Sequence, residues 1–344
     1  MMKKLSISIL VLGFLFGLGV HDVSAQKLPS IINIGTHPVG AFFHIIGTAT
    51  GAIVEKHTTM KTKVMPVGIT AWMPMMVTNE MDLGVLNSTD SKWGYFGMEA
   101  YKDLSKGQGF PMRLLLTGIC NDISIGVTGS SGIKRLSDLK GKRIAAGFAK
   151  TPAVQMQATA ALANGGLTWD DGRMVPVASP GDSGKAVMEG RADGAGSLTV
   201  GMPDVTDFTA KTGGYLVSFD PSPEAKARAL KAYPDGMLNL VKGGIWPGVP
   251  TDSWLLRYEI YVVARKDFPD DAAYQIIKAM WDYNKDLPSF NLKFAEWTPE
   301  TFASKNLTTP YHPGSIKFLK EKNLWSKELE AKQKELLIQK GEKG

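Results

Sequence analysis

The chain has 344 residues, 44% of them hydrophobic, with one cysteine and a formal net charge of +6 at pH 7. A chain of this length buries a large core and usually divides into two lobes. A single cysteine excludes an internal disulfide framework, and the basic residues lack the aromatic interleaving of a nucleic-acid surface, which argues against a nucleic-acid partner.

The first 25 residues are predicted to form a cleaved secretory signal peptide. Lys3 and Lys4 precede an apolar run over 5–20, and Val23-Ser24-Ala25 supplies a small-x-small cleavage site. The apolar run is short for a helix that spans a membrane, which needs roughly 20 residues. We therefore expect an exported, periplasmic protein that begins after Ala25.

The next part of the chain alternates short apolar strands with amphipathic helices. Strands are predicted at 31–35 (IINIG), 62–68 (TKVMPVG), 81–87 (MDLGVLN) and 112–119 (MRLLLTGI). Helices are predicted at 41–57 and 70–80, between these strands. This alternation is typical of an α/β sheet that is covered by helices.

A second set of elements follows and resembles the first. Strands are predicted at 123–129, 143–148, 174–179, 192–197 and 215–219, with helices at 151–163 and 182–189. In each set a helix ends in a turn that carries an aspartate, Asp82 or Asp193, and then enters a strand. The sequence therefore predicts two similar α/β lobes, each with a mostly parallel sheet.

The last third of the chain is expected to return to the first lobe. Residues 243–254 are rich in Gly and Pro, and YEIYVVAR at 258–265 predicts one more strand. We place the two crossings between lobes at Leu116–Ile119 and Trp254–Tyr258. The predicted division is listed by residue: lobe I at 26–118 plus 257–324, lobe II at 119–256, and a charged helical extension at 325–344. That extension has few apolar residues, so we expect a solvated helix that frays at its end.

Several predicted loops follow the carboxyl ends of strands, which is where open α/β sheets hold ligands. These loops are rich in Gly, Ser, Thr and Asn, and they offer amide and hydroxyl groups to a small anion. Capping of the helices that follow is the simpler interpretation of any one loop. The candidate ligand-binding residues are Thr36, Phe42, Phe43, Gly68, Ile69, Thr70, Trp72, Asn87, Ser88, Phe148, Lys150, Thr151, Ala153, Val154, Ser197 and Trp246.

The loop before the helix at 151–163 illustrates the chemistry that is expected. Thr151 stands at the N-cap and Pro152 at the first helical position, which leaves the amides of Ala153 and Val154 without partners inside the helix. Lys150 adds a positive charge beside them. We expect this loop to hold an anionic group such as a carboxylate.

Motifs of enzymes and metal sites are absent or misplaced. Gly-Asp-Ser-Gly at 181–184 matches the stretch around a trypsin-like nucleophile, but Ser183 is placed in an α/β lobe without the disulfides of that class. No P-loop motif occurs, and none of His37, His44, His57 and His312 belongs to an H-E-x-x-H motif. The methionines of WMPMM are better explained by core packing than by a soft metal. We expect no enzyme activity, cofactor or metal.

Short motifs follow one another in a recognisable order along the chain. They are I-G-T-H at 34–37 with Phe42-Phe43, V-G-I-T at 67–70, N-E-M-D-L-G at 79–84, IKRLSDLKGKRIAAG at 133–147, the loop 147–151 and T-P-Y-H-P-G-S at 309–315. Over about residues 31–319 this order resembles the TAXI group of solute receptors, the exported binding components of TRAP (tripartite ATP-independent periplasmic) transporters.

The resemblance implies a two-lobed receptor of the periplasmic-binding-protein type II fold, with the ligand between the lobes. It also implies a small organic acid or amino acid that bears a carboxylate as the ligand, and the membrane subunits of a TRAP permease as the partner. We expect a monomer. His37 stands where the family has Gly, and Ala149-Lys150 replace small neutral residues, so the identity of the ligand does not carry over.

Two alternatives stay open at this point. The same fold could serve an ABC importer or a sensor kinase, and an ATPase gene beside this one would favour that interpretation. A secreted enzyme that uses Ser183 or His37 is the other alternative. An unchanged turnover after Ser183→Ala would eliminate it.

Overall fold

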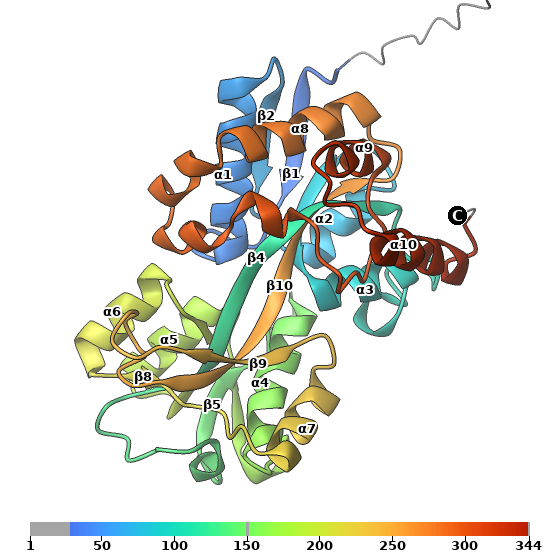
Figure 1. Cartoon of the computed structure of the whole chain (residues 1–344). Helices are drawn as coiled ribbons and strands as arrows, with labels where there is room; N and C mark the ends of the chain where they lie inside the picture. Colours follow the sequence, from blue (N-terminus) through green and yellow to red (C-terminus); the bar gives the residue numbers. More distant parts are fainter. Residues whose placement is uncertain (1–27, 149–150, 343–344) are drawn as a thin grey trace, which may run out of the picture.

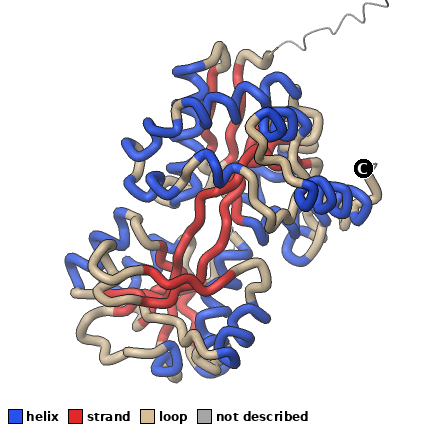
Figure 2. The backbone as a smooth tube through the Cα atoms, viewed as in Figure 1, coloured by secondary structure: helices blue, strands red, loops and turns tan. Residues whose placement is uncertain are grey.

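The computed structural model describes residues 28–148 and 151–342. Two lobes lie one above the other in Figure 1, and long strands connect them. Helices cover the strands in both lobes (Figure 2), which confirms the predicted α/β architecture. The predicted signal peptide lies outside the described residues.

Lobe I, the upper lobe in Figure 1, begins with three short strands and the helices that follow them. Its first elements are β1 (Ile31–Gly35), α1 (Phe42–His57), β2 (Lys61–Met65), α2 (Ile69–Met75), β3 (Leu83–Asn87), α3 (Ser88–Phe96) and η1 (Glu99–Tyr101). β1 pairs in parallel with both β2 and β3. The helix predicted at 70–80 ends early, at Met75, because Pro74 interrupts it and Asn79 takes a left-handed turn with φ of 59°.

Lobe II, the lower lobe, repeats this parallel arrangement. Its elements are η2 (Leu136–Leu139), β5 (Arg143–Ala146), α4 (Pro152–Asn164), η3 (Trp169–Asp171), β6 (Arg173–Pro176), α5 (Pro180–Met188), β7 (Gly194–Thr199), α6 (Pro203–Thr212), β8 (Tyr215–Leu216), α7 (Pro223–Ala232) and β9 (Met237–Val241). β5 pairs in parallel with β6 and β7. The sequence analysis did not predict β9.

Two long strands, β4 (Met112–Val127) and β10 (Ser253–Arg265), run through both lobes as antiparallel neighbours (Figures 1 and 2). They join the strands of both lobes into one sheet, in the order β2-β1-β3-β10-β4-β7-β5-β6. The strands predicted at 112–119 and 123–129 are therefore parts of one continuous strand. Asn121 and Asp122, which join the two parts, are buried like their neighbours. The proposed crossings at Leu116–Ile119 and Trp254–Tyr258 lie within β4 and β10.

The two aspartates that suggested a repeat occupy equivalent places. Asp82 accepts a hydrogen bond from the amide of Asn33 (2.9 Å), and its own amide donates to the Asn33 carbonyl. Asp193 accepts from the amide of Arg143 (2.8 Å) and donates to the Arg143 carbonyl in the same way. In both lobes an aspartate thus ties the start of one parallel strand to its neighbour.

The C-terminal part returns to lobe I as short helices. These are α8 (Asp270–Asp282), η4 (Asn284–Ser289), η5 (Leu292–Glu296), η6 (Pro299–Phe302), α9 (Pro313–Glu321) and α10 (Lys327–Gln339). No helix in the described part of the chain has the length and apolar character needed to cross a membrane.

The expectation that the C-terminal extension is a solvated helix is wrong for α10. Leu329 and Leu336 are buried, and the Gln333 side chain exchanges two hydrogen bonds with the Tyr311 backbone, at 2.7 and 3.1 Å. Just beyond α10, Glu342 pairs with Arg113 of β4. A few well-placed side chains dock this helix despite its low apolar content.

Candidate ligand-binding cleft

A cavity of about 510 Å³ lies between the lobes, which is within the usual range for small-molecule sites, about 300–1,000 Å³. Lobe I contributes the loop 37–43 that connects β1 to α1. Lobe II contributes the first turns of α4 and α5 and the end of β7. Asn121 of β4 and Tyr258 of β10 line it from the crossing strands. We call this cavity the cleft.

The lobe I wall of the cleft is aromatic. The His37 ring stacks on Phe43, with 4.0 Å between ring centroids and an interplanar angle of 10°, and Phe42 lies beside them. Burial lowers the pKa of His37 to about 3, so its ring is neutral at physiological pH. Thr36 lies behind this wall, where its hydroxyl donates to the His37 carbonyl (3.0 Å).

The polar residues of the cleft are linked to one another by hydrogen bonds. The Asn121 amide donates to the Tyr258 hydroxyl at 2.8 Å, and the Ser197 hydroxyl donates to Gln157 Oε1 at 2.7 Å. Ser197 has a left-handed backbone, with φ of 58°. These bonds fix the side chains, so they present a preorganised set of neutral donors and acceptors to the cleft.

Three buried polar atoms of the cleft residues have no hydrogen-bond partner among the described residues. They are His37 Nε2 from lobe I, Thr151 Oγ1 from lobe II and Asn121 Oδ1 from β4. Such atoms are rare in folded proteins, because a buried polar group without a partner costs about 1–3 kcal/mol. The residues that carry these atoms line the cleft from both lobes and from a crossing strand, which makes the cleft a candidate site for a polar ligand.

The first turn of α4 holds an anion that belongs to the protein itself. The Ala153 amide donates to Asp90 Oδ1 of lobe I (3.3 Å), and the Val154 amide donates to the Thr151 carbonyl (3.0 Å). Thr151 stands at the N-cap as predicted, but its side chain makes no capping bond. The prediction that these two amides are free is therefore wrong, because Asp90 and the local turn engage them.

Asp90 is fully buried, and two residues of lobe I, Tyr101 and Asn87, hold it besides α4. Its carboxylate accepts from the Tyr101 hydroxyl (2.8 Å) and the Asn87 amide (2.6 Å), and Asn87 also caps α3 by accepting from the Asp90 amide. Burial nevertheless raises the pKa of Asp90 to about 6. Asp90 thus forms a hydrogen-bonded contact between the two lobes at the edge of the cleft residues.

The lobe II wall carries acidic groups. Asp182, Asp204 and Asp207 line the cleft together with one cation, Lys185. Lys185 pairs with Asp182 (3.5 Å), and Lys211 pairs with Asp207 (2.7 Å). Asp204 forms no ion pair among the described residues, and burial raises its pKa against the smaller opposing effect of the nearby Lys185 ammonium. The described part of the cleft therefore has one carboxylate available to a cationic group of a ligand.

The structure brings together only some of the predicted site residues. Those that line the cleft are Phe42, Phe43, Thr151, Val154 and Ser197. Those found elsewhere among the described residues are Thr36, Gly68, Ile69, Thr70, Trp72, Asn87, Ser88, Phe148, Ala153 and Trp246. Lys150 lies outside the described residues.

The two tryptophans that were expected to wall the ligand are used otherwise. Trp72 is fully buried, and a Cβ on Gly35 or Gly84 would overlap its side chain. The absence of side chains at these two glycines therefore leaves the space that the Trp72 ring fills beside β1 and β3. Trp246 lies against Gly201 and over the Lys293 ammonium. Packing of large aromatic rings, which the loop pattern does not reveal, determines both positions.

The sequence analysis missed Asn121, Gln157, Tyr258 and the acidic wall. Asn121 stands in a long apolar run, and Gln157 stands in an alanine-rich helix. A polar residue that interrupts an apolar pattern was therefore the feature of the sequence that could have identified them. Tyr258 gave no signal, since it reads as one more apolar strand residue. The acidic wall comes from two helices that only the tertiary fold brings together.

The candidates for other chemistry have structural roles where they are described. The Ser183 hydroxyl is buried in α5 and donates to the Pro180 carbonyl (2.5 Å) and the Gly196 carbonyl (3.0 Å). His312 caps α9 by accepting from the Gly314 amide. Within residues 28–148 and 151–342, no cluster of three His, Cys, Asp or Glu side chains could hold a metal ion.

Comparison with known proteins gives a family match over most of the chain, since the NMT1-like family matches residues 34–322. The chain is also similar to several solved structures at low identity. PhnD1 from Prochlorococcus marinus in complex with methylphosphonate is 12% identical with a TM-score of 0.49, over 78% of this chain and 92% of that chain.

Two further solved structures have comparable scores. A putative periplasmic sulfonate-binding protein of an ABC transporter from Methylobacillus flagellatus is 14% identical with a TM-score of 0.47, over 87% of this chain and 96% of that chain. A substrate-binding protein of an amino acid ABC transporter is 13% identical with a TM-score of 0.44, over 78% and 98%. At such scores the likeness carries no conclusion about the ligand.

Proposed function

The chain belongs to the NMT1-like family, and we propose that it is a periplasmic solute-binding receptor that captures a small polar solute between its lobes. The observation that carries this proposal is the cleft between the lobes, which is lined by three residues, His37, Thr151 and Asn121, that each have a buried polar atom without a partner among the described residues. A solute that bonds to these atoms contacts lobe I, lobe II and a crossing strand at the same time.

Capture follows from differential binding. A ligand that contacts both lobes stabilises the arrangement in which the lobes approach each other, and β4 and β10 are the segments on which the lobes would move. The Asp90–Ala153 contact belongs to the same arrangement. The membrane partner would then recognise the ligand-bound form.

For the ligand we propose an amino acid rather than a simple organic acid. The hydroxyl of Thr151 and the neutral His37 ring suit a carboxylate, whereas the Ser197 hydroxyl already donates to Gln157. Asp204, which is half-buried without a paired cation among the described residues, suits an ammonium group. Lys150, next to Thr151 in the sequence, would add to the attraction for the carboxylate.

We propose a TRAP-type permease as the membrane partner. Support comes from the order of the short motifs between residues 34 and 315. Uptake of the ligand by membrane vesicles that contain a TRAP permease from the same operon, dependent on added receptor, is the expected result. Uptake that requires ATP hydrolysis would instead indicate an ABC importer.

A thermal-shift screen of the refolded protein tests the receptor function. The panel pairs each amino acid with its 2-hydroxy and 2-oxo acid analogues. A ligand at about one hundred times its Kd adds roughly 2.7 kcal/mol to stability, which is several degrees of Tm for a chain of this size. We expect one amino acid or a close group to give this shift.

Two matched variants test whether Asp204 recognises the ammonium group of the ligand. Asp204→Asn should remove the preference for the amino acid over its 2-hydroxy acid, whereas Asp207→Asn, whose carboxylate is paired with Lys211, should keep it. Equal shifts with the amino acid and its hydroxy acid in the unsubstituted protein would contradict the amino acid proposal. Absence of any shift across the panel, after unfolding and refolding, would contradict the receptor function for these solute classes.

A further inference from the structure

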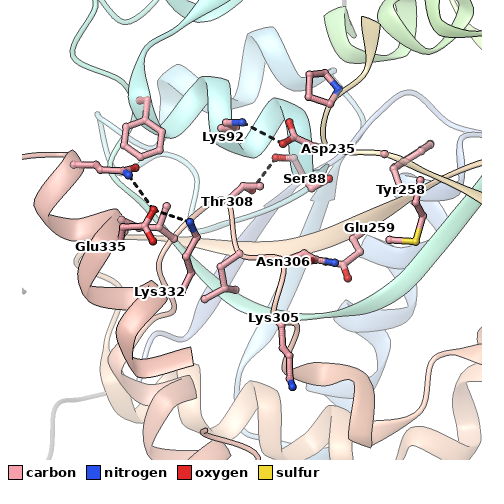
Figure 3. A pocket seen from close by; sticks show the side chains of 17 residues that line it. Ser88, Lys92, Asp235, Tyr258, Glu259, Lys305, Asn306, Thr308, Lys332 and Glu335 are labelled. Atoms are coloured by element: carbon pink, nitrogen blue, oxygen red, sulfur yellow. Dashed lines mark hydrogen bonds and ion pairs between the residues drawn. The ribbon is translucent and has the colours of Figure 1, made fainter. Parts of the chain in front are cut away.

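Two cavities of the described structure differ in the chemistry of their linings. One, of about 670 Å³, lies where α3, α10 and the turn between α7 and β9 meet (Figure 3). Three cations and three anions line it, and Figure 3 shows two of the ion pairs that they form, Lys92 with Asp235 and Lys332 with Glu335. An apolar lining is therefore not common to the cavities of this chain.

The cleft is the other cavity, and apolar side chains reach it from both lobes. They are Val39, Phe42 and Phe43 of lobe I and Val154, Met188 and Met202 of lobe II. Val39 is 74% exposed, which leaves most of its apolar surface open to contact with a bound molecule. The cleft can therefore bury apolar surface of a ligand between its two walls.

The cleft is also longer than the head group of an amino acid. The residues of α5 that line it include Gly181, Lys185 and Met188, which share one face of the helix. The seven steps from Gly181 to Met188 correspond to about 10 Å along the helix axis. A carboxylate and an ammonium group attached to one carbon atom fill only part of this length.

The buried polar atoms of the cleft are few, and a head group can use all of them. Ion pairs engage the carboxylates of Asp182 and Asp207, and hydrogen bonds engage the Asn121 amide and the Ser197 hydroxyl. The three buried atoms without a partner and the Asp204 carboxylate remain among the described residues. One carboxylate and one ammonium group supply enough acceptors and donors for these, so no buried polar atom is left for a polar side chain.

We propose that the cleft selects amino acids with a large apolar side chain, which packs against Val39 of lobe I and the Met188 end of α5. This inference rests on the proposed function, because it assigns the side chain of the amino acid whose head group was assigned above. Burial of a side chain such as that of leucine or phenylalanine favours binding, whereas a polar side chain of the same size would lose its bonds to water without replacement.

A basic side chain fits the cleft less well. Besides Asp204, the acidic lining residues are Asp182 and Asp207, and these already pair with Lys185 at 3.5 Å and with Lys211 at 2.7 Å. A basic side chain would have to displace one of these lysines.

Calorimetric titration of the refolded protein with single amino acids tests the proposal. The panel contrasts leucine, methionine and phenylalanine with alanine, asparagine and lysine. We expect at least one of the first three to bind tenfold or more tightly than each of the last three, since burial of such a side chain is worth at least one power of ten in Kd.

The outcomes of this titration separate the two proposals. Binding of alanine, asparagine or lysine with an affinity equal to or higher than that of the best apolar amino acid would overturn the apolar selection and leave the receptor function standing. Binding of no amino acid would contradict the proposed ligand class, and the apolar selection with it.

Matched variants locate the side chain of the ligand. Val39→Ser should weaken binding of the apolar amino acid about three- to tenfold and leave that of alanine unchanged. Val77→Ser is the control, because Val77 is 60% exposed and does not line the cleft. Both positions are exposed, so neither substitution should prevent folding.

A second pair tests the far end of the cleft. Met188→Gln should also reduce the preference for the apolar amino acid over alanine, whereas Met174→Gln, at a partly exposed position of β6 outside the cleft lining, should keep it. A preference that is unchanged in both Val39→Ser and Met188→Gln would overturn the proposal. So would an equal loss of affinity for alanine and for the apolar amino acid.

Discussion

The carboxylate of Asp90 is held by donors from both lobes, with Tyr101 and Asn87 on one side and the Ala153 amide on the other. These hydrogen bonds favour the charged form, yet full burial outweighs them and raises the pKa to about 6. Between the ordinary value of 3.8 and about 6 the folded state therefore binds more protons than the unfolded state. The Asp90 contribution to stability must fall as pH rises through that interval.

The fall of the Asp90 contribution to stability with rising pH gives a prediction for Asp90→Asn. Relative to the unsubstituted protein, the variant should gain about 2 kcal/mol in free energy of unfolding between pH 4 and pH 6.5, with almost no further gain above. Urea unfolding at pH 4, 5, 6 and 7.5 measures the difference. A constant offset is allowed, because the amide alters the hydrogen bonds. A difference that does not vary with pH would show that Asp90 is not buried as a charge.

Thr151 allows a second test at a single residue, since its hydroxyl lines the cleft without a partner among the described residues. Thr151→Val keeps the shape and removes the hydroxyl. We expect the affinity for the cleft ligand to fall about tenfold, as for the loss of one hydrogen bond, while the Tm without ligand stays within a degree or two. Calorimetric titration measures the affinity, and Thr78→Val on the exposed end of lobe I should bind normally.

At the scale of elements, the docking of α10 rests on few side chains. Leu336 is 3% exposed, whereas Ile338, two positions further, is 69% exposed. Leu336→Ala should reduce the free energy of unfolding by about 2–3 kcal/mol, while Ile338→Ala should change it by less than about 0.5 kcal/mol. Equal effects of the two substitutions in thermal or urea unfolding would mean that α10 is not packed against lobe I in solution.

The alternation of short apolar runs predicted the α/β elements well, because a strand such as Ile31–Gly35 and a helix such as Phe42–His57 carry their own periodicity. The continuity of β4 was not predictable, since Asn121 and Asp122 interrupt the apolar run and their partners, such as Tyr258 and Arg257 of the neighbouring strand, reach them only after folding. The docking of α10 escaped prediction for the same reason. Its main partner, the Tyr311 backbone, is recognised only after folding.

The candidate ligand-binding cleft was also predictable only in part, because some of its contacts form only after folding. Loops at strand ends were predicted to hold the ligand, and five of the predicted residues, Phe42, Phe43, Thr151, Val154 and Ser197, line the cleft. Which amides of that edge are available was not predictable, because Asp90, 63 residues before Ala153, takes the amide of α4. A helix N-terminus can therefore be interpreted as a ligand site only when the groups of the other lobe that contact it are known.

At the scale of the whole molecule, Lys92 of α3 and Asp235 of lobe II connect the lobes by an ion pair at 3.2 Å. If this pair supports the arrangement that binds ligand, Lys92→Met and Asp235→Asn should each weaken the affinity of the cleft ligand about two- to fivefold. The double variant should be no weaker than either single one, because the pair acts as a unit. Calorimetric titration of the four proteins forms the cycle, and strictly additive losses would contradict a role for the pair.

The measurement that addresses the central claim most directly is hydrogen exchange of the refolded protein with and without the amino acid found by the screen. A solute held between the lobes must protect amides in the 37–43 loop of lobe I and in the first turns of α4 and α5 of lobe II together, and leave α10 unchanged. Protection confined to one lobe, or none in the 37–43 loop, would contradict capture between the lobes.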